Sequence, residues 1–247
     1  MIQVHPLSGI DEIRPGADLV QAIVGAVEAA GLVLRSSDVL VVTQKIVSKA
    51  EGRFVDLATV RPSARAVDLA QVTRKDPRFV ELVLSESAEV VRAAPHVLIT
   101  RHRSGHVMAN AGIDRSNIGP VAGEWVLLLP LDTDASAESL RQSLPAQPAV
   151  VISDSFGRPW RHGVTCVAIG ASGLPALIDR RGDVDRDGRT LEVTQIGLGD
   201  MVATAAGLVT GEGAEGVPAA LVRGLSWDSE PRPASALVRP TDEDLFR

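Results

Sequence analysis

The stretch A-V-V-I-S-D-S-F-G-R-P-W-R-H-G, residues 149–163, combines the pattern of a buried strand with a dense set of polar side chains. Residues 149–152 are apolar and mostly β-branched, which predicts a buried strand. That strand would deliver Asp154, flanked by two serines, at its C-terminal end. Gly157 would then open a loop that carries two arginines, a tryptophan and a histidine.

The chemistry of this stretch suits either a metal–phosphate site or an ordinary turn. A carboxylate such as Asp154 holds a hard cation, and the guanidiniums of Arg158 and Arg161 can bind phosphate or carboxylate oxygens through paired hydrogen bonds. A strand end with a capping Asp and a solvated basic loop accounts for the same residues. Taken alone, the stretch favours neither interpretation.

The bulk composition is that of a soluble globular protein with one large domain or two small ones. Its 247 residues are 45% hydrophobic and 23% charged, which is ordinary for this class. Because aromatics make up 3% and Tyr is absent, the core must rest on Val, Leu, Ile and Ala. The net charge of −6 argues against a general nucleic-acid-binding protein. An anionic substrate is still compatible with it, since local arginines or metals override the net charge.

The single cysteine and the N-terminal sequence indicate a reducing compartment. One cysteine excludes an internal disulfide, and Cys166, within the apolar run 164–169, is expected to be a buried structural thiol. The N-terminus lacks the basic and apolar regions of an export signal, and no apolar segment approaches the ~20 residues that span a bilayer. We therefore expect a soluble, cytoplasmic protein.

Helix and strand patterns alternate irregularly, which favours a mixed α+β fold over a doubly wound sheet. An amphipathic helix is predicted over 17–30 and a buried strand within 32–43. Ser136 is expected to cap a helix over 137–143. The other predicted elements are two short helices within 63–85, strands at 89–92, 97–100, 106–109 and 126–129, a segment at 45–53 that turns away from the preceding strand, a turn at 110–117, and loops at 180–189 and 210–218.

Several common functional motifs are absent. The sequence has no Walker-type phosphate loop, no G-x-G-x-x-G after a strand and no G-x-S-x-G. His102 and His106 have no Cys or third His at zinc-ligand spacing, so we expect exposed loop histidines there. The acidic loop 180–189 lacks the spacing and terminal Glu of an EF-hand and is expected to be solvated.

Side chains with oxygen atoms occur in pairs in four predicted turns. Each pair alone is more typical of residues that stabilise a turn than of metal ligands. Together, with Lys49 and Arg158 nearby, they would form a site for Mg²⁺ or Mn²⁺ and a polyphosphate. The groups are Asp114 with Asn117, Asp132 with Asp134, Asp154 with Ser155, and Glu212 with Glu215.

Seven segments, taken in order, resemble those of the coenzyme F420-0:L-glutamate ligase family, the γ-glutamyl ligases of deazaflavin cofactor biosynthesis. They are P-L-S-G-I (6–10), V-V-T-Q-K-I-V-S-K-A-E-G-R (41–53), A-G-I-D-R-S-N (111–117), L-P-L-D-T-D-A-S-A (129–137), I-S-D-S-F-G-R-P-W-R-H-G (152–163), D-G-R-T-L-E-V-T (187–194) and G-E-G-A-E-G-V-P (211–218). The resemblance runs from about Val4 to Arg223, and we treat residues 1–247 as one ligase domain.

The resemblance implies GTP-dependent amide formation between L-glutamate and the carboxylate of the deazaflavin precursor F420-0. Amide formation from a carboxylate requires activation, which a phosphoryl transfer from GTP supplies as an acyl phosphate. The family also implies Mg²⁺ or Mn²⁺, an assisting monovalent cation such as K⁺, and an intertwined homodimer built from mixed sheets with flanking helices. It implies neither a nucleic-acid partner nor a membrane.

The family's functional residues fall on specific positions of this chain. Metal ligands fall on Asp114, Asp154 and Ser155, with Glu212 as a further candidate. Arg158 and Arg161 would neutralise anionic oxygens during catalysis, and His162 is one candidate for the base that deprotonates glutamate. The GTP contacts fall on Ile10, Asp11, Glu12, Ile13, Gln44, Lys49, Asn117, Gly211, Glu212, Gly213 and Gly216.

Two other functions would use part of this set. A metal-dependent phosphohydrolase would use the same Asp and Arg groups, yet it would cleave GTP without an acceptor. A non-catalytic nucleotide- or deazaflavin-binding module would keep Lys49 and Arg158 without both aspartates. The presence of Asp114, Asp154 and the loop 211–216 favours the ligase over the module. The chain departs from the family at Gln44, where Ser is frequent, and at 10–13, where a more apolar segment is usual.

Overall fold

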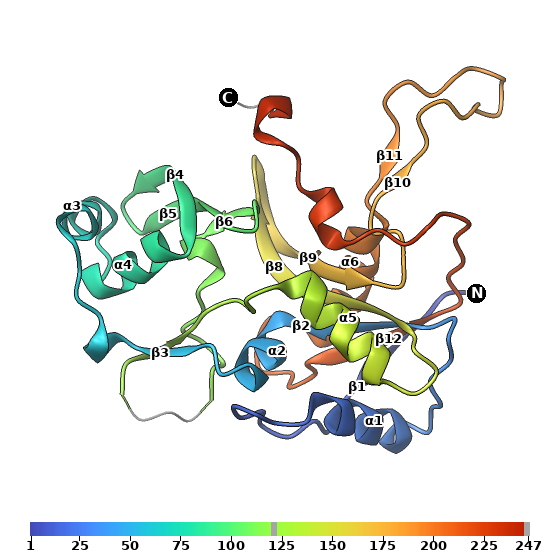
Figure 1. Ribbon diagram of the computed structural model, residues 1–247, viewed down its shortest axis with the longest axis horizontal. Coiled ribbons are helices and arrows are strands. Elements are labelled where there is room, and N and C mark those ends of the chain that lie inside the picture. The colour runs from blue at the N-terminus through green and yellow to red at the C-terminus, as the bar shows by residue number, and fades with distance from the viewer. Residues whose placement is uncertain (120–122, 245–247) are drawn as a thin grey trace.

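A mixed five-stranded sheet forms the centre of the computed structural model, which describes residues 1–119 and 123–244 (Figure 1). The strand order is β1-β12-β2-β8-β9, so the last strand of the sheet lies between the first two. β2 and β8 run parallel, and the other neighbouring pairs are antiparallel. The strands are β1 (Gln3–Leu7), β2 (Val39–Thr43), β8 (Ala149–Arg158), β9 (Arg161–Ser172) and β12 (Ala219–Arg223).

Helices cover both faces of this sheet, which explains why its central strands are apolar on both sides. α1 (Leu19–Ala29) and α5 (Thr133–Ser143) pack on one face, where Ile152 points into the core. α6 (Leu198–Thr210) packs on the other face, against the neighbouring residue Val151. Val151 and Ile152 are both fully buried. The predicted buried strand at 149–152 is therefore confirmed.

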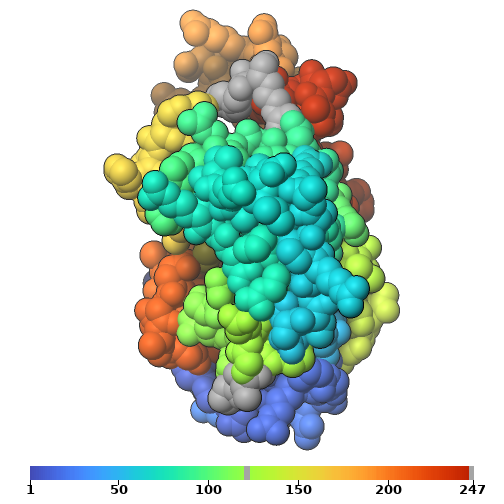
Figure 2. All heavy atoms as spheres, turned by 90° about the vertical axis from the view of Figure 1, so that its left-hand side faces the viewer, coloured from blue at the N-terminus to red at the C-terminus, as the bar shows by residue number. Residues whose placement is uncertain are grey.

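A smaller unit with its own core projects from the sheet (Figure 1). Its helices α3 (Ala64–Thr73) and α4 (Pro77–Ser85) pack against the antiparallel sheet β4-β5-β6. In Figure 2 these cyan and green segments form the face turned toward the viewer. The strands are β4 (Ser87–Ala94), β5 (Val97–His102) and β6 (Val107–Ala109), joined by the pair β3 (Phe54–Asp56) and β7 (Trp125–Leu127).

The remaining elements are short. They are α2 (Gln44–Ala50), the strand pair β10 (Ile178–Asp179) and β11 (Gln195–Ile196), and the 3₁₀ turns Leu57–Thr59, Asn110–Gly112, Ala234–Leu237 and Thr241–Glu243. No helix in the described part of the chain combines the length and apolarity needed to cross a membrane.

Most predicted elements are confirmed, and three expectations were wrong in detail. The helix over 137–143 begins earlier, at Thr133, because the carboxylate of Asp132 accepts the Ala135 N–H and caps the helix in place of Ser136. The strand within 32–43 is confined to Val39–Thr43. Neither His102 nor His106 is an exposed loop histidine, since His102 ends β5 and is 7% exposed, and His106 is half-buried.

Candidate functional site

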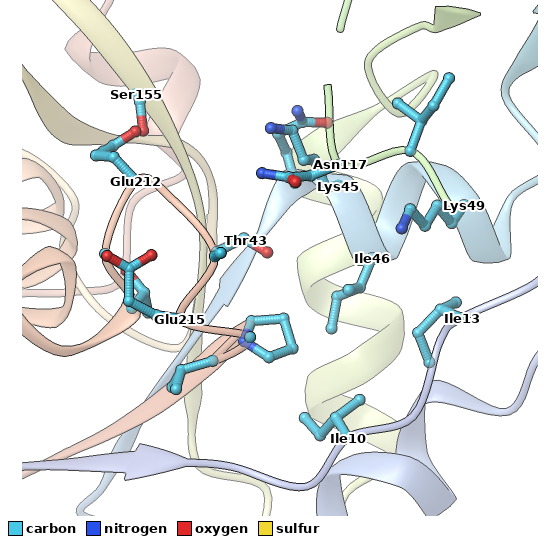
Figure 3. Close-up of a pocket in the computed structure, with 18 of the residues that line it drawn as sticks. Ile10, Ile13, Thr43, Lys45, Ile46, Lys49, Asn117, Ser155, Glu212 and Glu215 are labelled. Atoms are coloured by element: carbon cyan, nitrogen blue, oxygen red, sulfur yellow. The ribbon is translucent and has the colours of Figure 1, made fainter. Parts of the chain in front are cut away.

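A cavity of about 660 Å³ opens where β2 ends beside the middle of β8 (Figure 3). The two strands are parallel and in register from Val39–Ala149 to Thr43–Ser153, so their last paired residues emerge together. The carboxyl ends of parallel strands are a common place for ligand sites. The cavity is lined by residues 10–13, 43–46, 49, 115, 117–119, 153–155, 166 and 210–218.

α2 begins immediately after β2 and directs polar side chains into this region. Gln44 is 2% exposed, and its Nε2 donates a hydrogen bond of 2.6 Å to Asp114 Oδ2. Lys45 Nζ lies 3.4 Å from Asp114 Oδ1. Burial raises the pKa of Asp114, and the Lys45 charge opposes that shift. The carboxylate of Asp114 is thus held between the amide and the ammonium of the first turn of α2.

A second carboxylate group comes from β8 and the loop that follows α6. Ser155 Oγ donates a hydrogen bond of 2.6 Å to Glu212 Oε1, which ties the strand to the loop. The neighbouring Asp154 accepts the Ser155 N–H at 2.8 Å. Burial, followed by the charge of Asp114, raises the pKa of Asp154 to about 7. This strand therefore holds a carboxyl group that resists carrying a negative charge in its present surroundings.

The charge of Glu212 contributes to the raised pKa values of both Asp114 and Asp154, and the charge of Asp114 also raises the pKa of Asp154. A hard cation relieves such repulsion, and an all-oxygen donor set with a serine hydroxyl suits Mg²⁺ or Mn²⁺. Within residues 1–119 and 123–244, no three His, Cys, Asp or Glu side chains are arranged to hold one ion as they stand. In this structure Asp114 is hydrogen-bonded to α2 and Glu212 to Ser155. Their oxygen atoms and negative charges are nevertheless of the kind that binds a hard cation.

The opposite wall of the cavity contains the buried ammonium group of Lys49 and two loops that are joined by a hydrogen bond. Lys49 is 5% exposed, and its ammonium is paired with Glu12 of the N-terminal segment. Asn117 Nδ2 donates a hydrogen bond of 3.1 Å to the carbonyl of Gly213. The structure thus places the expected GTP contacts of 10–13, 44, 49, 117 and 211–216 around one cavity.

Arg158, Arg161 and His162 do not line this cavity. The strand was expected to end near Asp154, and that expectation was wrong. β8 continues to Arg158 and pairs with β9 through a two-residue turn, so the three side chains lie at the tip of a hairpin. There, Arg158 Nη2 donates a hydrogen bond of 2.7 Å to the carbonyl of His162.

Lys45 and Cys166 are among the cavity residues that the sequence interpretation did not assign to the site. Lys45 lines the cavity beside Asp114, and its position directly after Gln44 at a strand end was the available signal. Cys166 was expected to be buried, which its 8% exposure confirms. It also lines the cavity, with its Sγ 3.9 Å from Ser155 Oγ. The β8–β9 register pairs these two residues.

Comparison with known proteins finds similar sequences along most of the chain. The family model described as F420-0:Gamma-glutamyl ligase matches residues 9–224. The chain is similar to a protein named coenzyme F420:L-glutamate ligase from Methanopyrus kandleri, at 44% identity over 100% of this chain and 98% of the relative. Relatives of the same name come from Methanothermobacter thermautotrophicus, at 40% identity over 100% and 99%, and from Halorubrum lacusprofundi, at 45% over 92% and 88%.

Proposed function

Because this chain belongs to the F420-0:gamma-glutamyl ligase family, we propose that it joins L-glutamate to F420-0 by a γ-glutamyl amide bond, with GTP as the activating cosubstrate. The observation that carries the proposal is that Asp154, Glu212 and the lysines of α2 line one cavity, with Asp114 held beside it by Gln44 and Lys45. Such a site suits the handling of several anionic oxygens at once.

The reaction follows from the chemistry of amide formation. The γ-phosphoryl group of GTP is transferred to the acceptor carboxylate, which gives GDP and an acyl phosphate. The amine of glutamate then attacks the acyl carbon, and inorganic phosphate leaves as the amide bond forms. Because phosphoryl transfer requires mainly positioning and neutralisation of charge, this route needs no nucleophilic side chain.

The lysines of α2 suit the nucleotide phosphates. Lys49 is buried and carries its charge on a flexible stem, so it acts as a point charge toward a phosphate oxygen. Lys45 approaches the same region from the first turn of the helix. We assign Asn117, the loop 211–216 and the segment 10–13 to the remainder of GTP, because they form the rest of the cavity wall.

Asp114, Asp154, Ser155 and Glu212 would hold Mg²⁺ or Mn²⁺. When bound, such a cation neutralises charge on the transferred phosphoryl group and holds the reacting oxygens in line. We further propose that K⁺ assists and that the protein acts as a homodimer, as the family resemblance implies. The roles expected for Arg158, Arg161 and His162 remain predictions, and no step is assigned to them.

Release of phosphate and GDP, measured with and without F420-0, tests this function. A ligase should consume GTP slowly until the acceptor is present, because the acceptor carboxylate completes the reactive geometry. GDP, phosphate and the glutamylated product, identified by mass, should then appear in equal amounts. Hydroxylamine in place of glutamate should trap the acyl phosphate. Full-rate phosphate release without acceptor would indicate a phosphohydrolase, and no release under any condition would indicate a binding module.

A further inference from the structure

A second groove runs along the β8–β9 pair, apart from the cavity described above. It consists of two adjoining hollows of about 540 and 300 Å³ that meet at His106. Successive residues of β9 line it, with Val167 in the smaller hollow and Ile169 in the larger. We call it the β9 groove. Figure 1 shows β6 and the red C-terminal segment on either side of the β8–β9 hairpin.

The walls of the β9 groove are fixed by specific contacts. The turn between β5 and β6 approaches the C-terminal segment so closely that a Cβ on Gly105, whose φ is 90°, would lie 2.7 Å from Val238 Cγ1. The carboxylate of Asp134 accepts the N–H groups of Ala234 and Ser235 at 2.8 and 3.1 Å. These hydrogen bonds therefore hold the C-terminal segment in place as one wall of the groove.

The smaller hollow has the lining of a site for a flat aromatic group. Phe156 and His106 meet edge to face, with ring centroids 5.9 Å apart and planes at 86°. Val167 and Val238 add apolar surface. The Asp200 carboxylate, which also lines this hollow, already accepts the Ala168 N–H at 2.9 Å. An aromatic ring inserted here would contact aromatic and branched side chains, which suits its faces and edges.

The larger hollow offers a positive charge for an acidic group. Arg103 lines it and is exposed, and its guanidinium has no hydrogen bond among the described residues. The three carboxylates of the same hollow are engaged internally: Glu86 pairs with Arg53 at 3.2 Å, Asp132 caps α5, and Asp134 accepts backbone N–H groups. Arg103, whose charge also acts on Glu86, can therefore still donate hydrogen bonds to an acidic group.

The strand register brings the β9 groove next to the carboxylate cluster. Val167 pairs directly with Asp154, and the pairing is regular from Ser153 to Gly157. Directly paired residues share one face of a sheet, as do residues two apart on one strand. Asp154, Phe156 and Val167 consequently lie on the same face. A ligand that contacts Val167 in the groove therefore lies next to Asp154, whose carboxyl group we assign to the reacting centre.

We propose that the β9 groove binds the acceptor substrate: a fused, flat heteroaromatic ring sits against Phe156 and His106, and its acidic tail extends along the same face to Asp154. This inference rests on the proposed function, whose deazaflavin acceptor has a ring of this class. Phe156 and Val238 thereby become specificity-determining residues for the acceptor, while the nucleotide occupies the first cavity.

Titration of F420-0 into the full chain, followed by the fluorescence of its deazaflavin ring, tests the assignment. Two variants are compared with wild type: Phe156→Ala removes the aromatic wall, and Val238→Trp fills the hollow. Val72→Trp, on the exposed face of α3 at 49% exposure, is the matched control. We expect both groove variants to weaken F420-0 binding by about tenfold or more, with the KM for F420-0 raised and the affinity for GTP unchanged. The control should match wild type.

The outcomes separate this proposal from the function on which it rests. If wild-type protein bound no F420-0, the proposed function would be wrong and the groove assignment would fall with it. If wild type bound F420-0 and both groove variants bound it equally well, the groove alone would be wrong. Equal weakening of GTP and F420-0 binding would also overturn the assignment, because it would indicate a general loss of structure.

Discussion

Gln44 Nε2 donates a 2.6 Å hydrogen bond to Asp114 Oδ2, which joins two residues seventy positions apart in the sequence. The same side chain accepts a hydrogen bond of 2.9 Å from Ser48 Oγ through its Oε1. Both of its polar ends are therefore fixed, and the residue is almost completely buried. The orientation of the Asp114 carboxylate is set by α2 before any ligand arrives.

Substituting Gln44→Leu should weaken binding of Mn²⁺ while leaving the fold intact. Loss of a partner that orients a ligating carboxylate typically costs about 10- to 100-fold in metal affinity. Calorimetric titration with Mn²⁺ measures this directly. Gln21→Leu, on the exposed side of α1, is the control and should bind like wild type. Unchanged Mn²⁺ affinity in Gln44→Leu would show that Asp114 needs no such support or is not a ligand.

Substituting Asp154→Asn should abolish turnover, because a neutral amide ligates a hard cation poorly. The variant should remain folded. Burial raises the pKa of Asp154 to about 7, so this carboxyl favours its protonated form, and its contribution to stability is lost as the pH rises from about 4 through 7. Without divalent cations, Asp154→Asn should therefore be at least as stable as wild type at pH 8. Circular dichroism melts and product formation measure both effects, and near-normal turnover would contradict the metal role.

Substituting Lys49→Ala should weaken GTP binding more than F420-0 binding. A lost charged hydrogen bond to phosphate costs about 1.5–3 kcal/mol, which is roughly tenfold to a hundredfold in affinity. The Glu12 carboxylate would also lose its partner. Titration with GTP measures the effect, and Lys75→Ala in the smaller unit serves as the control. An unchanged GTP affinity would make the ammonium of Lys49 a purely structural partner of Glu12.

The stability of the protein should fall in acid partly through His106. Burial lowers the pKa of His106 to about 4, whereas an unfolded histidine titrates near 6.5. The unfolded state therefore binds more protons between these values, and this group's contribution to stability is lost as the pH falls from about 6.5 to 4. Denaturant unfolding of His106→Gln across this range should show a shallower decline than wild type. Parallel curves for the two proteins would mean that His106 is readily protonated in the folded state.

The sequence predicted the apolar first half of β8 better than its polar second half. The run 149–152 is buried on both faces, so its composition alone indicates a strand. The following residues to Arg158 extend the same strand although they are largely polar, because β9 pairs with them out to the hairpin. Gly157 suggested a strand end, but it precedes a register shift, and the turn itself falls at Pro159 and Trp160.

The sequence and the family resemblance led us to expect these residues in one site, but the contacts between them could not be predicted. Asp114, Asp154 and Glu212 come from three separate parts of the chain, and only the folded structure brings their charges together. Lys45 was overlooked because its one local signal, its position directly after Gln44 at a strand end, does not by itself distinguish it from a solvated lysine. Cys166 shows the reverse limit: its burial was predicted from its apolar neighbours, yet its place beside Ser155 follows from the pairing of β8 with β9.

The position of β12 between β1 and β2 has a consequence for synthesis of the chain. β1 leaves the ribosome first, but its partner in the sheet, residues 219–223, is made more than two hundred residues later. Until then β1 has no neighbour and β2 presents an open edge, the kind of surface that invites pairing with other chains. Because contacts so distant in sequence form slowly, we expect the nascent protein to depend on protection of these edges, and a chain that stops before residue 219 to aggregate.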